Sequence, residues 1–307
     1  MKLIRGVAGA LEPAAGCVVT VGTYDGLHLG HQALLARLAR HAQAARVSAV
    51  LLTFEPTPRE FLRPAEPPAR LTSLRERWRI LDGMPVDYLW LLRFGESLRN
   101  LTGEAFAQLL ARQLRASLVV VGHDFRFGYK GEATAAVLTA AGSRLGFGVD
   151  VVEPVCLEGV RVSSSGIREA LAVADFARAA RWLGRPWSMR GRVRAGDRLG
   201  RQLGFPTANL ALERVRAPVA GIFAVRVHGV AGSALPAVAS LGSRPTVGGV
   251  ETLLEAHIFD YDGDLYEREI EVEFVAKLRE EQRFAGLPEL TAQMQRDADE
   301  ARALLRA

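Results

Sequence analysis

The sequence has two cysteines, Cys17 and Cys156, in 307 residues, too few for a disulfide scaffold or a zinc ribbon. We expect both to be buried as small apolar side chains. No apolar run approaches the roughly 18 residues that cross a bilayer, and the N-terminal MKLIRGVAG lacks the apolar core of a signal peptide. These absences predict a cytoplasmic protein with no membrane partner.

Lysine is scarce as well, with Lys2, Lys130 and Lys277 the only examples, so the positive charge is almost all arginine. The formal net charge is +5. Such a balance points to a polyanionic partner: nucleic acid, an anionic membrane or a phosphorylated small molecule. Aromatic residues make up only 7% of the chain, and no RNA-binding module is recognisable, so nucleic acid is disfavoured. Several arginines are expected on a solvated helix face: Arg75, Arg77 and Arg79.

The length favours two domains, and the apolar pattern changes at the Gly-Arg-Pro of residues 184–186. Up to residue 184, short apolar runs alternate with stretches of helical period, which predicts an α/β domain with a Rossmann-like parallel sheet. A proline-rich segment, residues 55–68, is expected to be a surface loop. The strands are predicted at 18–22, 47–54, 86–91, 118–122 and 149–153, and the helices at 29–44, 74–81, 104–114 and 133–145.

From residue 185 to residue 307 the runs are short, strand-like and separated by Gly, Asp and Pro. This pattern predicts an antiparallel β-barrel or sandwich. Apolar residues at helical spacing then predict a long C-terminal helix that begins near Pro288. The barrel strands are predicted at 188–194, 222–228, 237–240, 253–259 and 270–275.

Residues 19–31 read VTVGTYDGLHLGH and lead from a predicted strand through a turn into a helix. Amides at a helix N-terminus favour phosphate at that position. His28 and His31 would share one face of the first turn, where imidazole N–H groups can bond phosphate oxygens. A histidine pair at this spacing is often structural, but its placement favours function. Zinc is a weak alternative because no third ligand lies nearby.

Residues 191–209 read GRVRAGDRLGRQLGFPTAN, and their glycines and arginines predict a basic loop between strands that can hold a polyphosphate. It is not a Walker loop, because G-x-x-x-x-G-K-[ST] is missing from the sequence. Thr207 and Asn209 would face the same side of an extended strand, and their oxygens suit Mg²⁺.

These motifs resemble those of the bifunctional riboflavin kinase/FMN adenylyltransferases, the bacterial FAD synthetases, over nearly the whole chain. GTYDGLHLGH is similar to the family's G-x-F-D-G-x-H-x-G-H, and residues 121–128 to its V-G-x-D-F-R-F-G. Residues 163–168 are similar to S-S-T-x-I-R, and residues 196–209 to the riboflavin kinase motif G-x-x-x-G-R-x-L-G-F-P-T-A-N. The chain departs from the usual residues at a few positions: Tyr24, Thr57, Ser165 and Glu267.

In the N-terminal domain, the resemblance implies that His28, His31 and Arg168 act in catalysis by binding the phosphates of ATP, with serines closing from across the cleft. Asp124 and Phe125 would lie by the FMN or adenine pocket and are assigned to flavin binding. The other implied ATP-binding residues are Gly22, Tyr24, Asp25, Gly26, Gly30, Ser164 and Ser165.

In the C-terminal domain, the resemblance implies that Thr207 and Asn209 coordinate the Mg²⁺ of ATP. Glu255 would be the general base, although a glutamate in an alternating strand otherwise commonly faces solvent. Arg279 would lie near the isoalloxazine ring. The loop implied to cover the phosphates contains Gly196, Arg198, Gly200, Arg201 and Gly204.

The implied function is therefore phosphorylation of riboflavin to FMN by residues 185–307 and adenylylation of FMN to FAD by residues 1–184. The small-molecule partners are riboflavin, FMN and ATP. An alternative is an FMN adenylyltransferase whose barrel only binds flavin, and a nucleic-acid-binding protein is a second. The sequence leaves open a homo-oligomer, the relative rates and reversibility of the two steps, and the transfer of FMN between sites.

Overall fold

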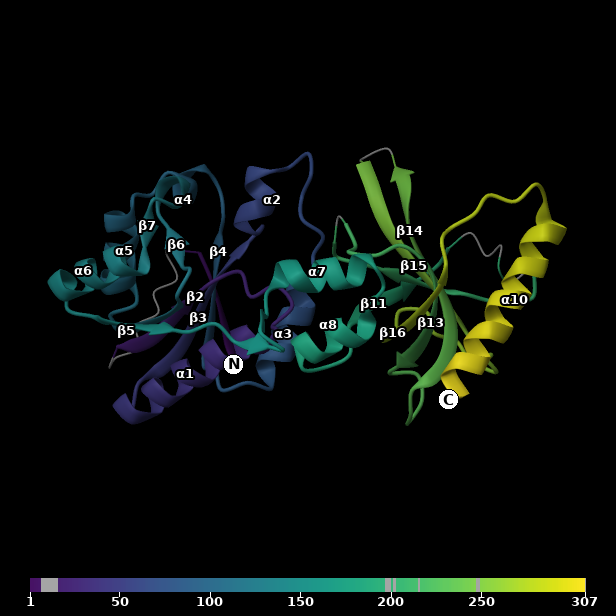
Figure 1. Cartoon of the computed structure of the whole chain (residues 1–307), viewed down its shortest axis with the longest axis horizontal. Coiled ribbons are helices and arrows are strands. Elements are labelled where there is room, and N and C mark those ends of the chain that lie inside the picture. Colours follow the sequence, from purple (N-terminus) through teal and green to yellow (C-terminus); the bar gives the residue numbers. More distant parts are fainter. Residues whose placement is uncertain (7–15, 197–199, 201–202, 215, 247–248, 307) are drawn as a thin grey trace. The chain divides into compact units, whose positions relative to one another are not determined.

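The computed structural model describes residues 1–6, 16–196, 200, 203–214, 216–246 and 249–306 (Figure 1). It divides into two compact units. The first unit comprises Met1–Pro68 and Arg77–Ser163, and the second comprises Ala69–Glu76 and Ser164–Ala307. The functional boundary at residue 184, which the sequence predicts, stays a prediction.

The first unit contains a six-stranded parallel sheet in the order β1-β4-β3-β2-β5-β8. The parallel sheet is confirmed, and the five predicted strands fall within two residues of their observed bounds. The sequence pattern missed β1, a strand of four residues at the sheet edge. The strands are β1 (Lys2–Arg5), β2 (Cys17–Val21), β3 (Ser48–Glu55), β4 (Tyr88–Arg93), β5 (Ala116–Gly122) and β8 (Gly148–Val152).

Helices cover both faces of this sheet (Figure 1), as buried parallel strands require. Val18, Leu51 and Val120 pack with α1, whereas Val19 and Val119 pack with α5 and α6 on the other face. Successive apolar side chains along a strand thus point to opposite faces of the sheet and pack into two separate cores. The longer helices of the unit are α1 (Leu29–Ala45), α3 (Leu74–Asp82), which continues from the second unit, α5 (Gly103–Gln113) and α6 (Ala135–Leu145).

Shorter elements complete the first unit. Residues 55–68 are not loop throughout, as the sequence analysis expects, because they contain the helix α2 (Pro58–Leu62). Pro58 occupies the first turn, where a proline loses no hydrogen bond, and Thr57 and Glu60 form a capping box. The remaining short elements are α4 (Glu96–Arg99), a 3₁₀ turn (Tyr129–Gly131), β6 (Arg126–Phe127), β7 (Ala133–Thr134), β9 (Cys156–Leu157) and β10 (Val160–Arg161).

The second unit is a closed antiparallel barrel in the order β11-β12-β15-β14-β13-β16, followed by the predicted long helix. Helix α10 packs against β13, β14 and β16 (Figure 1). Phe176, Trp187, Phe223 and Phe274 form one aromatic cluster. The elements are α7 (Ser164–Ala172), α8 (Phe176–Leu183), β11 (Ser188–Arg194), β12 (Ala208–Ala211), β13 (Gly221–His228), β14 (Leu235–Thr246), β15 (Gly249–Ile258), β16 (Glu269–Arg279) and α10 (Leu287–Arg306).

The segment Ala69–Glu76, which we call the strap, belongs to the second unit although it lies in the first half of the sequence. Glu76 is 7% exposed and accepts hydrogen bonds from the Ser73 and Arg190 amides at 2.6 and 2.8 Å. It also forms an ion pair with the buried Arg214. Glu76, which forms a capping box with Ser73, thus ties the strap to β11 of the barrel through the Arg190 amide.

The two cysteines, both expected to be buried, differ in their exposure. Cys17 is buried, and burial raises the pKa of its thiol to about 12. Cys156 is exposed, contrary to expectation, because it lies in the short β9–β10 hairpin outside the main sheet.

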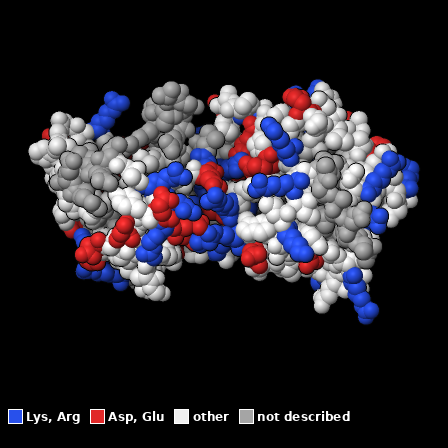
Figure 2. All heavy atoms as spheres, turned by 180° about the vertical axis from the view of Figure 1, so that it is seen from behind, with Lys and Arg blue, Asp and Glu red and all other residues white. Residues whose placement is uncertain are grey.

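Basic and acidic side chains are interspersed on the face shown in Figure 2. Among the described residues, no helix combines the length and apolarity needed to cross a membrane.

We predict that Glu76→Gln destabilises the second unit, because Arg214 would keep a buried charge without its carboxylate partner. Breaking a buried pair in this way costs about 3–5 kcal/mol. Urea unfolding measures the loss, and hydrogen exchange should locate it in β11. Glu66→Gln, at an exposed position, is the matched control. Equal stability of the two variants would contradict the role of the strap.

Candidate functional site

The turn after β2 stands at the carboxyl edge of the sheet, where the strand order reverses. From β2 the chain continues to β3 and β4 on one side, whereas β5 pairs with β2 on the other. Ligands of open α/β sheets bind at such a switch point. The turn is tight, because Tyr24 and Leu27 have φ values of 50° and 48° and Gly26 has φ 86°. The predicted phosphate-binding turn is thus built at the expected edge.

His28 and His31 lie together, as their spacing predicts. Their rings stack at 3.7 Å between centroids, and the Nδ1 of His28 accepts a hydrogen bond from the His31 amide at 3.3 Å. His28 is therefore the N-cap of α1, and its Nε2 carries the proton when the ring is neutral. A Cβ on Gly30 would stand 3.1 Å from the His28 ring, so glycine permits this packing.

His31 is held in its neutral form. Burial lowers the pKa of His31 well below its usual value, and the nearby His28 and Arg77 lower it further. The Tyr24 ring lies 4.8 Å from the His31 ring, and the Tyr24 hydroxyl is 2.5 Å from the Thr20 Oγ1. Asp25 is buried in the same turn. A neutral imidazole carries one ring N–H, so His31 can donate one hydrogen bond.

Arg77 is a buried cation behind this turn, although the sequence analysis expects it on a solvated face. It is 2% exposed and donates to the Thr23 carbonyl at 2.7 Å and to Glu55 at 2.9 Å. The signal that reveals it is its spacing, since it precedes the buried Leu81 by one helical turn. Arg77 joins the end of β3 to the start of the histidine turn.

Asp124 and Phe125 follow β5 at the same sheet edge as the histidine turn, because β2 and β5 are parallel neighbours. Burial opposes the charge of Asp124, but a hydrogen bond of 2.6 Å from Arg161 prevails and lowers the carboxyl pKa. Phe125 stacks on Phe127 at 5.3 Å. Sequence reasoning missed Arg161, which stands 37 residues from its partner.

Ser164, Ser165 and Arg168 lie in α7, which belongs to the second unit. The Arg168 Nε donates to the carbonyl of Ala69 at 2.5 Å. Ser164 and Arg168 are half-buried, and Ser165 is exposed. Their predicted closure on the phosphates of ATP stays a prediction.

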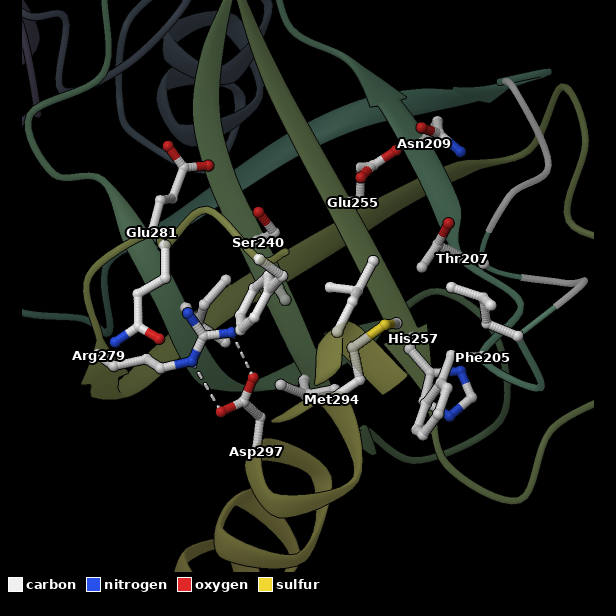
Figure 3. A pocket seen from close by; sticks show the side chains of 18 of the residues that line it. Phe205, Thr207, Asn209, Ser240, Glu255, His257, Arg279, Glu281, Met294 and Asp297 are labelled. Atoms are coloured by element: carbon white, nitrogen blue, oxygen red, sulfur yellow. Dashed lines mark hydrogen bonds and ion pairs between the residues drawn. The ribbon is translucent and has the colours of Figure 1, made fainter. Parts of the chain in front are cut away.

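The barrel holds a cavity of about 590 Å³. Asn209 and Glu255, which are paired across β12 and β15, lie at one end with Thr207, and Arg279 lies at the other with Asp297 (Figure 3). Ser240, the partner of Glu255 on β14, stands between the two ends. Hydroxyl, amide and carboxylate oxygens thus meet at one end, and a guanidinium group marks the other.

Arg279 is fixed by a bidentate ion pair with Asp297, with nitrogen–oxygen distances of 2.9 and 2.7 Å. Asp297 belongs to α10, is 4% exposed and also accepts from Gln293 at 2.8 Å. The Nη1 of Arg279 donates to the Glu280 carbonyl at 2.9 Å, so the planar guanidinium group is held in a set orientation. The helix predicted at the C-terminus therefore positions a pocket residue.

The glycine-rich loop reaches the same cavity through Gly200, whose carbonyl accepts the Phe205 amide at 2.7 Å. Gly204 follows with φ 85°. A Cβ on Gly196 would stand 2.7 Å from the Asn209 side chain, so any larger residue would displace that amide. Arg198 and Arg201, also predicted to bind phosphate, lie outside the described residues.

His257 lines the cavity two residues after Glu255, and sequence reasoning gave it no role. Its Nδ1 is 2.8 Å from the Pro206 carbonyl. Burial lowers the pKa of His257, which the hydrogen bond to Pro206 partly opposes. Within the described ranges, no group of three or more His, Cys, Asp or Glu side chains is arranged to hold a metal.

Two family models match the chain in succession. The FAD synthetase model matches residues 11–166, and the riboflavin kinase model matches residues 183–305. The bifunctional riboflavin kinase/FMN adenylyltransferase of Escherichia coli (strain K12) is 44% identical over 304 residues, covering 98% of this chain and 97% of the relative. The protein of the same name from Pseudomonas fluorescens is also 44% identical, covering 99% and 98%.

The Haemophilus influenzae protein of that name is 39% identical over 99% of both chains. Among solved structures, one titled a macrolide-efflux protein from Streptococcus pneumoniae matches with a TM-score of 0.82 and 30% identity. It covers 98% of this chain and 99% of its own. The sequence similarity thus extends over essentially the full length of the three relatives, and the fold is shared with the solved structure over essentially its full length.

We predict that Arg77→Met raises the pKa of His31, because a nearby positive charge disfavours protonation of the ring. That pKa should stay below its usual value, since burial and His28 remain. The variant should also lose about 1–3 kcal/mol of stability, because hydrogen-bond acceptors lose their donor. NMR titration of the imidazole signals measures the pKa. Arg79→Met, at an exposed position, is the control, and an unchanged His31 pKa in Arg77→Met would refute the coupling.

Proposed function

Because the chain belongs to the family of bifunctional riboflavin kinase/FMN adenylyltransferases, we propose how its residues carry the two reactions. Residues 185–307 phosphorylate riboflavin to FMN with ATP. Residues 1–184 then transfer AMP from a second ATP to FMN, which gives FAD and pyrophosphate. The observation that carries the proposal is that one chain contains both features. The rings of His28 and His31 stack, and Asn209 and Glu255, which are paired across β12 and β15, line the cavity.

In the kinase step, the oxygen of the riboflavin 5′-hydroxyl attacks the γ-phosphorus of ATP. Glu255 takes the proton of that hydroxyl. The bond from that phosphorus to the β,γ-bridging oxygen breaks, and ADP leaves. A base is needed because the alcohol must lose its proton on becoming a phosphate ester. The residues that hold the ATP phosphates are Gly196, Arg198, Gly200, Arg201 and Gly204.

Thr207 and Asn209 would hold the Mg²⁺ that accompanies ATP. Their hydroxyl and amide oxygens line the cavity beside Glu255, and oxygen donors of this kind fit Mg²⁺. With so few protein ligands, phosphate oxygens and water would complete the shell. When bound, the ion neutralises charge on the phosphates.

At the other end of the cavity, Arg279 faces the isoalloxazine ring. Its guanidinium group, held by Asp297, donates hydrogen bonds to the polar edge of that ring. The support for this assignment is the separation of the two polar ends within one cavity (Figure 3), which suits a long substrate with a ring at one end and a hydroxyl at the other.

In the adenylyl step, a phosphate oxygen of FMN attacks the α-phosphorus of ATP in line, and pyrophosphate leaves. No covalent intermediate on the protein is needed, so positioning and charge stabilisation supply the catalysis. His28 and His31 donate hydrogen bonds to phosphate oxygens, and Arg168 adds positive charge. The turn residues Gly22, Tyr24, Asp25, Gly26 and Gly30, with Ser164 and Ser165, surround the nucleotide, and Asp124 and Phe125 contact the flavin.

Both steps consume ATP, which is supplied inside the cell, and we therefore place the enzyme in the cytoplasm. A single chain is proposed to carry both active sites. FMN is the product of the first step and the substrate of the second.

We predict that Glu255→Gln lowers the rate of FMN formation from riboflavin about 10²–10⁴-fold, the range for loss of a general base. The amide keeps the size of the side chain but cannot accept the proton. Chromatography of the flavins after incubation with riboflavin, ATP and Mg²⁺ measures FMN. FAD formation from supplied FMN is the control and should be unchanged. Normal phosphorylation of riboflavin by this variant would instead favour an adenylyltransferase with a flavin-binding barrel.

We predict the reverse pattern for the double variant His28→Ala, His31→Ala. FMN should form from riboflavin and accumulate, because the barrel is untouched, whereas FAD formation should fall about 10³-fold or more with the loss of positioned donors. The same chromatographic assay measures both products. FAD formation at the wild-type rate would disprove the role of the histidine pair.

A further inference from the structure

Pro206 immediately precedes Thr207, and its carbonyl belongs to the peptide that joins the two residues. The paired residues of β12 and β15 begin with Ala208 and Ala256, so Pro206 lies outside this ladder. Its carbonyl oxygen is a strong acceptor that needs a partner. The position of this peptide sets the direction in which the Thr207 hydroxyl points into the cavity.

The partner is His257. Its Nδ1 lies 2.8 Å from the Pro206 oxygen, and since a carbonyl only accepts, Nδ1 must carry the proton. This distance is that of a well-formed hydrogen bond. A side chain of β15 therefore holds the backbone of the segment that leads into β12.

The ring of His257 is itself fixed by two aromatic edges. Phe205 and Phe259 lie 5.3 and 5.7 Å away, each in an edge-to-face arrangement. The guanidinium group of Arg302, from α10, covers the Phe259 ring at 4.1 Å. A donor held from both sides loses little conformational freedom when it binds.

The pairing of β12 with β15 places the His257 side chain close to the proposed kinase site. Glu255 is paired with Asn209, and His257, two residues further along the same face of β15, reaches the peptide before Thr207. One strand thus carries the proposed base and, one pleat away, a hydrogen bond to the peptide that precedes the proposed Mg²⁺ ligands.

We propose that His257 is a positioning residue of the kinase site: through the Pro206 carbonyl it orients Thr207 for Mg²⁺·ATP. This inference rests on the proposed function of the cavity and adds to it a residue that touches neither substrate nor metal. Without the hydrogen bond, the Thr207 peptide can rotate, so nucleotide binding weakens more than catalysis by Glu255.

Two substitutions separate the hydrogen bond from simple packing. His257→Phe keeps an aromatic ring between Phe205 and Phe259 but has no donor. His257→Asn loses the ring but offers an amide N–H close to the place of Nδ1. If the ring only fills space, His257→Phe should preserve nucleotide binding and His257→Asn should weaken it. If the hydrogen bond orients Thr207, His257→Asn should preserve nucleotide binding and His257→Phe should weaken it.

The first measurement is calorimetric binding of β,γ-imido-ATP with and without Mg²⁺. It is made in the His28→Ala, His31→Ala background, so that the heat reports the barrel. We expect His257→Phe to weaken the Mg²⁺-dependent affinity about five- to tenfold, in line with one lost hydrogen bond. His257→Asn should lie within about twofold of the parent if its amide replaces that bond.

The second measurement is steady-state kinetics in the otherwise unmodified chain. For riboflavin phosphorylation, His257→Phe should raise the KM for ATP several-fold and change kcat little. Adenylylation of supplied FMN by the same variant serves as an internal control for folding and should be unchanged. Thermal unfolding of both variants identifies a loss that is only structural.

The outcomes are distinct. Unchanged affinity in His257→Phe, or a larger loss in His257→Asn than in His257→Phe, would overturn the positioning role while leaving the proposed kinase site intact. If the parent protein binds the analogue with no dependence on Mg²⁺, the proposed Thr207–Asn209 site itself fails and the inference fails with it.

Discussion

A buried charge must be met by hydrogen bonds or an opposite charge, and the consecutive residues Glu76 and Arg77 meet this requirement in different units. Arg77 is bonded to Thr23 and Glu55 in the first unit, where it fixes the turn that carries the histidine pair. Glu76 is bonded to the Arg190 amide and to Arg214 in the second, where it anchors β11, the strand that leads into the glycine-rich loop. The turn after β2 and the strand β11 are thus each bonded to a buried ionic group, and α3 carries both groups in one turn of helix.

The two candidate sites use the same physical means on different folds. Each places hydrogen-bonding groups at strand ends or along a strand register, so that the backbone sets their spacing. In the first unit a parallel sheet brings the turns after β2 and β5 to one edge. In the second unit an antiparallel ladder sets Asn209 opposite Glu255. Transfer of phosphoryl and nucleotidyl groups depends mainly on such positioning and on charge, which both architectures supply.

Much of this could be predicted from the sequence. Alternation and helical period located the five predicted strands and four predicted helices of residues 1–184 to within two residues, although they missed β1. The spacing of His28 and His31 correctly predicted a shared face. What could not be predicted depends on contacts distant in sequence. Arg77 resembles a surface arginine until Glu55 and Thr23 fold against it, and Arg161 meets Asp124 only through the β9–β10 hairpin. Similarly, His257 gains meaning from Pro206, which lies 51 residues away. The short capped helix α2 was missed because the prolines of residues 55–68 suggested only a loop.

The central claim is that residues 1–184 carry the adenylyl step, that residues 185–307 carry the kinase step and that FMN links them. It is tested most directly by mixing two inactivated chains, the His28→Ala, His31→Ala variant and the Glu255→Gln variant, with riboflavin, ATP and Mg²⁺. Neither variant alone should convert riboflavin to FAD at an appreciable rate. The mixture should do so, after a lag in which free FMN builds up. FAD formed from riboflavin by either variant alone would contradict the account. So would the absence of FAD from the mixture, provided that the first variant releases FMN and the second adenylylates supplied FMN.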